Sequence, residues 1–156
     1  MSHPDVEREW VVRFLDDLRA AEAAGAEVLD AWIAVCPLDG LRGGLRTIAE
    51  REAGHAELLA ERLAEIGFAC RAALPEPIRV QALARFGSPA VADEEKLALL
   101  LLRYPDAASA SRPITAVLEH LAHDQETREM LRLVADGEDA TLAWLRAYHE
   151  GLIRSS

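Results

Sequence analysis

Carboxylates stand near the middle of three apolar stripes in this sequence. Stepping three or four residues at a time, as one face of a helix does, the first stripe contains Glu22, the second Glu52 and His55, and the third Glu138. An ionised carboxylate inside an apolar core is costly, so it is expected to be paired, protonated or bound to a cation. Carboxylate and imidazole together suit iron, manganese or zinc. These residues therefore predict a metal site, with a metal-free hydrogen-bonded cluster as the alternative.

The spacing of the residues predicts that they meet at similar depth. Glu52 and His55 are three residues apart, so both project from one face of a helix. Glu22 and Glu52 each lie roughly 15–20 Å along their helices from a shared loop, so they can face one another across an antiparallel pair. The full stripes are Val11, Leu15, Leu18, Glu22, Gly25, Leu29, Trp32, Cys36; Leu41, Leu45, Ile48, Glu52, His55, Leu59, Leu63, Ile66; and Leu131, Val134, Glu138, Thr141, Leu145, Tyr148, Leu152.

The elements that position these side chains are predicted to be helices. A residue before proline is pushed out of the α region, so Cys36-Pro37 ends the first helix, and Gly67 is a good residue to end the second. The last helical region is expected to be interrupted at either Asp124 or the Asp136-Gly137 pair. The predicted helices cover residues 4–35, 41–66, 78–86, 90–104 and 114–152.

The motif Glu52-Ala53-Gly54-His55, preceded by Glu22, resembles the Glu and Glu-x-x-His ligands of ferritin-like di-metal carboxylate proteins such as bacterioferritin and rubrerythrin. The resemblance extends over residues 52–63 and over residues 135–145, where Glu138 matches the Glu of the second motif. It implies an all-α, antiparallel four-helix bundle with a long crossover, residues 67–89, between helices 2 and 3. In that layout Glu22, Glu52, His55 and Glu138 surround one metal ion.

Two departures from the family pattern limit what the resemblance implies. Thr141 stands where the second motif has His, and Glu119, the candidate ligand of the third helix, lies off its stripe. The resemblance therefore implies a single iron or manganese ion in a mononuclear or degenerate site. If the protein is an enzyme, it is expected to be an oxidoreductase acting on dioxygen, peroxide or iron.

Other interpretations stay open for several residues. Asp136 as an N-cap would make Glu138 a first-turn acid favoured by the helix dipole. His120, His123 and Glu126 have ligand-like spacing, but such a set is also typical of an exposed polar face.

Composition bounds the class of protein. A length of 156 residues with 51% hydrophobic residues suits one helical domain over residues 1–156, and a net charge of −10 argues against nucleic acid as a partner. The apolar run Leu97–Leu102 is too short to span a membrane. With no signal peptide apparent and with Cys36 and Cys70 predicted too far apart to pair, a cytoplasmic location is expected.

The sequence also allows a second class of function, protein–protein interaction. The helices carry more large apolar residues than four narrow stripes need, which favours a homodimer. The rival to the metal-binding function is therefore a non-catalytic helical bundle that serves protein–protein interaction, with exposed parts of Leu97–Leu102, Trp10 or Trp144 in the interface.

Overall fold

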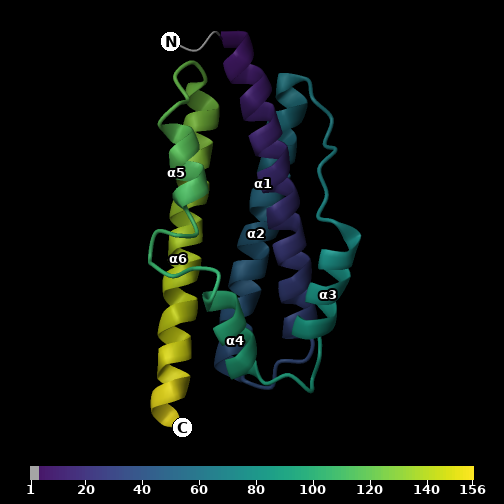
Figure 1. Ribbon diagram of the computed structural model, residues 1–156, viewed down its shortest axis with the longest axis vertical. Coiled ribbons are helices and arrows are strands. Elements are labelled where there is room, and N and C mark those ends of the chain that lie inside the picture. The colour runs from purple at the N-terminus through teal and green to yellow at the C-terminus, as the bar shows by residue number, and fades with distance from the viewer. Residues whose placement is uncertain (1–3) are drawn as a thin grey trace. The chain divides into compact units, whose positions relative to one another are not determined.

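The computed structural model describes the backbone of residues 4–156 and the side chains of residues 6–156, and its regular secondary structure is helical (Figure 1). Residues 4–156 contain no β-strand, so the all-α prediction is confirmed. None of the helices in this range is both long and apolar enough to cross a membrane. The helices are α1 (Pro4–Ile33), α2 (Asp39–Ile66), α3 (Glu76–Phe86), α4 (Asp93–Leu101), α5 (Arg112–Leu118) and α6 (Gln125–Ser155).

The chain forms two compact units, Met1–Pro89 and Ala90–Ser156. In the first unit, α1 and α2 lie side by side as an antiparallel hairpin (Figure 1). The hairpin is held by large apolar side chains that are almost completely buried, each worth about 1.5–3 kcal/mol relative to exposure. These are Val11, Leu15, Leu29 and Trp32 from α1, and Leu41, Leu45, Ile48, Leu59 and Leu63 from α2.

The ends of α1 and of α2 follow from local chemistry. Pro37 lies in the short loop that follows α1, where it prevents the helix from continuing. At the end of α2, Gly67 adopts a left-handed conformation with φ of 94°. The N–H of Gly67 donates to the carbonyl of Ala64 at 3.0 Å, and that of Phe68 to the carbonyl of Leu63 at 2.9 Å. Such bonds satisfy carbonyls at a helix end and allow the chain to leave sharply.

The segment between α2 and α3 is fastened to α1 by Asp16. Its carboxylate accepts hydrogen bonds from the backbone N–H of Arg71 at 2.9 Å and of Ala72 at 2.8 Å. Arg19 donates both to this carboxylate and to the carbonyl of Ala72. Because the segment lies outside any helix or sheet, its backbone lacks regular hydrogen bonds, and these side chains supply partners for it.

The short helix α3 then packs on α1. The Arg79 guanidinium forms an ion pair with Glu27 at 2.5 Å, and the ring of Phe86 lies 5.5 Å from that of Trp32. Both groups of the ion pair are partly exposed, so the pair contributes little, and the aromatic contact carries more of the packing energy.

The second unit is built on α6, against which α4 and α5 pack. Asp124 caps α6, because its side chain accepts from the N–H of Thr127 at 3.0 Å. Arg128 donates to the carbonyls of Leu118 and Leu121 and so joins the end of α5 to the start of α6. The predicted interruption therefore falls at Asp124, and α6 continues through Asp136-Gly137.

The long helices differ in number from the expectation. Within residues 4–156, α1, α2 and α6 have 28–31 residues, whereas α3, α4 and α5 have 7–11. The expected third helix is reduced to α4, which ends at Leu101, four residues before Pro105. The four-helix ferritin-like bundle and the single domain over residues 1–156 therefore stay predictions.

The Asp16 contacts predict a pH-dependent contribution to stability. Partial burial raises the pKa of this carboxyl, but the hydrogen bonds from Arg71, Ala72 and Arg19 outweigh burial, and the pKa lies below its ordinary value. Asp16→Ala should lower the free energy of unfolding at neutral pH by about 1–3 kcal/mol, because two backbone donors lose a charged acceptor.

The pH dependence of this effect has a defined sign. Since folding depresses the pKa of Asp16, its contribution is present above the unfolded value of about 3.9 and is lost as pH falls through the folded value. Urea unfolding of wild type and Asp16→Ala should therefore give curves that converge in acid. The neighbouring, exposed Asp17 provides the control, and an equal loss of stability in Asp17→Ala would contradict the assignment.

Candidate metal site in the first helical hairpin

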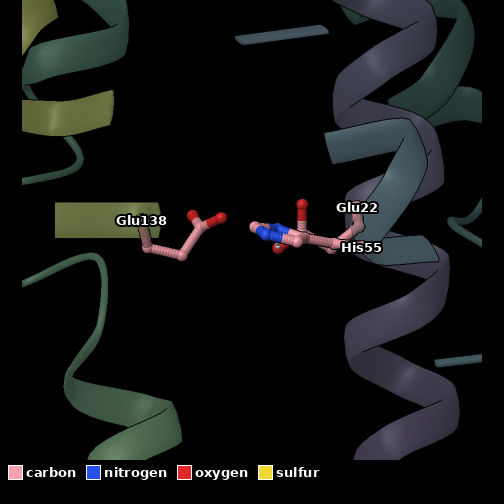
Figure 2. A group of neighbouring side chains, drawn as sticks. All are labelled: Glu22, His55 and Glu138. Carbon is pink, nitrogen blue, oxygen red and sulfur yellow. Dashed lines mark ion pairs between the residues drawn. The ribbon is translucent and has the colours of Figure 1, made fainter. Parts of the chain in front are cut away.

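Glu22 of α1 and His55 of α2 lie close together on one side of the hairpin. Nδ1 of His55 lies 3.6 Å from Oε1 of Glu22, and their side chains are 12% and 5% exposed. Figure 2 shows the two side chains projecting from their helices toward the same point. A separation of 3.6 Å suits an ion pair but is too long for a hydrogen bond, so the gap leaves room for both groups to approach a common ion.

Glu52 lies on the same side of the hairpin, next to Glu22. Burial raises the pKa of its carboxyl, the nearby Glu22 raises it further, and Arg51 lowers it, with a net value of about 8. Its Oε2 atom is buried and has no hydrogen-bond partner among the described residues. A buried carboxylate oxygen without a donor is costly, so this atom requires a proton or a cation.

The backbone of α1 makes room for this carboxylate at Gly25. A Cβ atom built on Gly25 would collide with Oε2 of Glu52 and would lie 3.2 Å from its Cδ. The periodicity of the sequence places Gly25 in the first stripe but does not reveal this role. The sequence does hold a sign of it, because a glycine three residues after Glu22 sits in an otherwise mostly apolar stripe.

The three side chains carry the ligand types, carboxylate and imidazole, that iron and manganese take. The repulsion between the two neighbouring carboxylates is relieved either by a proton on Glu52 or by a cation, and the imidazole adds a nitrogen ligand. Two observations favour a bound ion at this place. The Oε2 atom of Glu52 lacks a hydrogen-bond partner in the part of the chain that the structure describes, and the missing side chain of Gly25 leaves space for the carboxylate. The residues therefore fit the kind of metal that the resemblance implies.

Glu138, the third side chain drawn in Figure 2, belongs to α6 of the second unit. It is partly buried and lies in the middle of α6, between the buried residues Val134 and Thr141. Because α6 begins at Gln125, Asp136 is not an N-cap and Glu138 is not a first-turn acid. The adjacent Asp139, which the sequence analysis missed, has a buried Oδ1 atom with no hydrogen-bond partner in the described part of the chain.

The other ligand-like residues are not gathered in the core. Glu119 is exposed at the end of α5, and His120, His123 and Glu126 are also exposed. The two histidines lie in the loop before α6, so the three residues of this set do not share one helical face. They form part of the polar surface, as the alternative interpretation predicts.

The remaining candidates are packing residues and thiols. Trp32 is fully buried, Trp10 is 43% exposed, and Trp144 packs on Tyr148 with 5.2 Å between ring centroids. Within the described residues both cysteines are free thiols, Cys36 buried and Cys70 exposed.

Comparisons of the chain with protein-family models, with curated proteins and with solved structures find no match. The ferritin-like resemblance therefore stays a prediction carried by the motif residues. The interpretation of the site depends on the geometry and charge of Glu22, Glu52 and His55 in the first unit.

The raised pKa of Glu52 predicts how stability depends on pH in metal-free buffer. Between the ordinary value of 4.5 and about 8, the unfolded chain releases a proton that the folded protein keeps. Stability is therefore expected to fall as pH rises through this window. Since one pKa unit corresponds to about 1.4 kcal/mol, the loss amounts to a few kcal/mol.

Glu52→Gln should remove this loss, because the amide cannot ionise. In urea unfolding with a chelator present, the free energy of unfolding of the variant should rise relative to that of wild type as pH increases across the window. Glu57→Gln, at an exposed position of the same helix, is the control and should follow wild type. Parallel pH profiles for wild type and Glu52→Gln would contradict the burial of an ionisable Glu52.

Proposed function

We propose that this chain is a ferritin-like metal-binding protein in which Glu22, Glu52 and His55 hold a single iron or manganese ion. The observation that carries the proposal is the buried Oε2 atom of Glu52, which lacks a hydrogen-bond donor among the described residues and lies beside a second carboxylate. A divalent cation satisfies that oxygen and offsets the repulsion between Glu22 and Glu52 together.

The ligand types support iron or manganese among the divalent metals. Carboxylates are the ligands that manganese prefers, and a mixture of carboxylate and imidazole is typical of non-haem iron. No cysteine belongs to the set, so a structural zinc site of the thiolate kind is not favoured.

Glu138 is the fourth ligand in this proposal, as the resemblance implies. Its support within the second unit is its partly buried place in the middle of α6, between the buried residues Val134 and Thr141. Thr141 leaves the second position of the family pattern without an imidazole, so the proposed site is mononuclear or degenerate. A bound iron or manganese would supply redox chemistry toward dioxygen, peroxide or iron, while the chain's own residues bind the ion and exclude water from it.

Glu52→Ala should abolish uptake of the ion. Wild type, purified and stripped of metal, is expected to bind one equivalent of Mn²⁺, or of Fe²⁺ without oxygen, in isothermal calorimetry. The added ion should also raise the melting temperature of wild type but not of Glu52→Ala, because a ligand that binds only the folded state stabilises it. Glu138→Ala should weaken binding.

Glu57→Ala is the matched control for this experiment, since it removes an exposed carboxylate from the same helix. It should bind the ion as wild type does. Absence of stoichiometric binding by wild type would end the metal proposal, and unchanged binding by Glu138→Ala would remove Glu138 from the ligand set.

The rival function, a bundle for protein–protein interaction, is favoured by a different observation. Several large apolar side chains are exposed, with Leu102 at 79%, Leu133 at 70% and Trp10 at 43%. Leu97, at the start of the apolar run, is fully buried, whereas Leu102, at its end, is 79% exposed and available to a partner. We propose a homodimer as the form in which such side chains are covered.

The assembly state is expected to be a monomer or a dimer. Light scattering should report a mass of one or two times 17.1 kDa. If a dimer forms, Leu102→Glu should shift it toward monomer at micromolar concentration, because it places a charge in an apolar contact. A mass of several hundred kilodaltons, as for a storage cage, would contradict this expectation.

A further inference from the structure

We propose that Gly25 is a positioning residue, whose missing side chain sets where the carboxylate of Glu52 lies in the hairpin. This inference rests on the proposed function, in which Glu52 is a ligand. A Cβ at position 25 would occupy the place of the Glu52 carboxylate. Gly25 and Glu52 both belong to the first unit, so the contact depends only on the α1–α2 pair.

Gly25 differs in its surroundings from three other helical glycines. A Cβ at Gly43, Gly54 or Gly151 would meet no atom of the described residues within 4 Å. Glycine in a helix interior is less favourable than alanine, so its presence in the middle of α1 lowers the stability of that helix. At Gly25 the loss of helix stability is offset, because a Cβ at this position would collide with the carboxylate of Glu52.

The nature of the collision predicts what a substitution does. The atoms that a Cβ would meet belong to the far end of a flexible side chain. In Gly25→Ala the helices should therefore stay together while the carboxylate of Glu52 turns away. Metal binding depends on the position of that carboxylate, whereas the fold depends mainly on the apolar residues around it. The substitution should then damage affinity more than folding.

The first experiment measures Mn²⁺ affinity by calorimetry on the full chain. Gly25→Ala should raise the Kd by about 10–100-fold, the range found when residues that orient metal ligands are changed. Gly54→Ala is the matched control, since it adds the same methyl group to a helix beside His55 without a collision, and its Kd should stay within about twofold of wild type. An unchanged Kd in Gly25→Ala would overturn the inference.

A second variant separates positioning from a general disturbance of α1. Glu52→Asp shortens the side chain by one methylene and withdraws the carboxylate from position 25. The double variant Gly25→Ala/Glu52→Asp should therefore bind Mn²⁺ more tightly than Gly25→Ala alone. If the double variant binds no better, the loss in Gly25→Ala comes from the helix and not from the carboxylate, and the inference fails.

A third measurement does not depend on metal, so it distinguishes failure of the inference from failure of the proposed function. In chelator-containing buffer, the change in melting temperature caused by Gly25→Ala is compared in wild type and in Glu52→Ala. Contact between the two positions requires that the two changes differ, whereas Gly54→Ala should give equal changes in both backgrounds. Equal changes for Gly25→Ala would overturn the inference. A difference, in a wild type that takes up no Mn²⁺, would support the position of the carboxylate while the proposed function fails.

Discussion

The burial of two carboxylates in one apolar seam is the constraint on which the first unit depends. Glu22 and Glu52 lie where α1 and α2 pack together, and apolar side chains on both sides hold the seam closed. The packing energy of those side chains is large enough to keep the polar groups out of water. The hairpin thus carries an electrostatic cost near its middle, seen in the raised pKa of Glu52.

Much of the hairpin could be predicted from the sequence because its determinants are local. Pro37 and Gly67 act on the backbone of their immediate neighbours, so the ends of both helices fall within about two residues of expectation. The period of the stripes and the short loop together set which residues of α1 face which residues of α2. Counting from the loop predicts that Glu22 and Glu52 meet, and the structure places Glu22 beside Glu52 and also beside His55, on the next turn of α2.

The features that could not be predicted depend on side-chain conformation or on competing local preferences. The position of the Glu52 carboxylate against Gly25 is a matter of rotamer and close packing, which periodicity does not contain. Asp124 and Asp136-Gly137 were equally plausible breaks from sequence. The helix passes Gly137 because the buried residues of α6 continue in phase across it, and this burial outweighs the roughly 1 kcal/mol cost of a glycine. The expected third helix is shorter because residues 102–111 form turns, in which the Asp106 carboxylate accepts from the N–H of Ala108 at 3.1 Å and from Arg112 at 2.8 Å.

The two thiols of the first unit differ in solvent exposure, so one of them can be labelled selectively. Cys36 is buried, while Cys70 is exposed and directly precedes Arg71, whose N–H is held by Asp16. Alkylating reagents reach an exposed thiol far sooner than a buried one, so Cys70 is the natural attachment point for a fluorophore or spin label. A label there sits beside the fastening between α1 and the segment that follows α2, and its mobility reports whether that fastening is made.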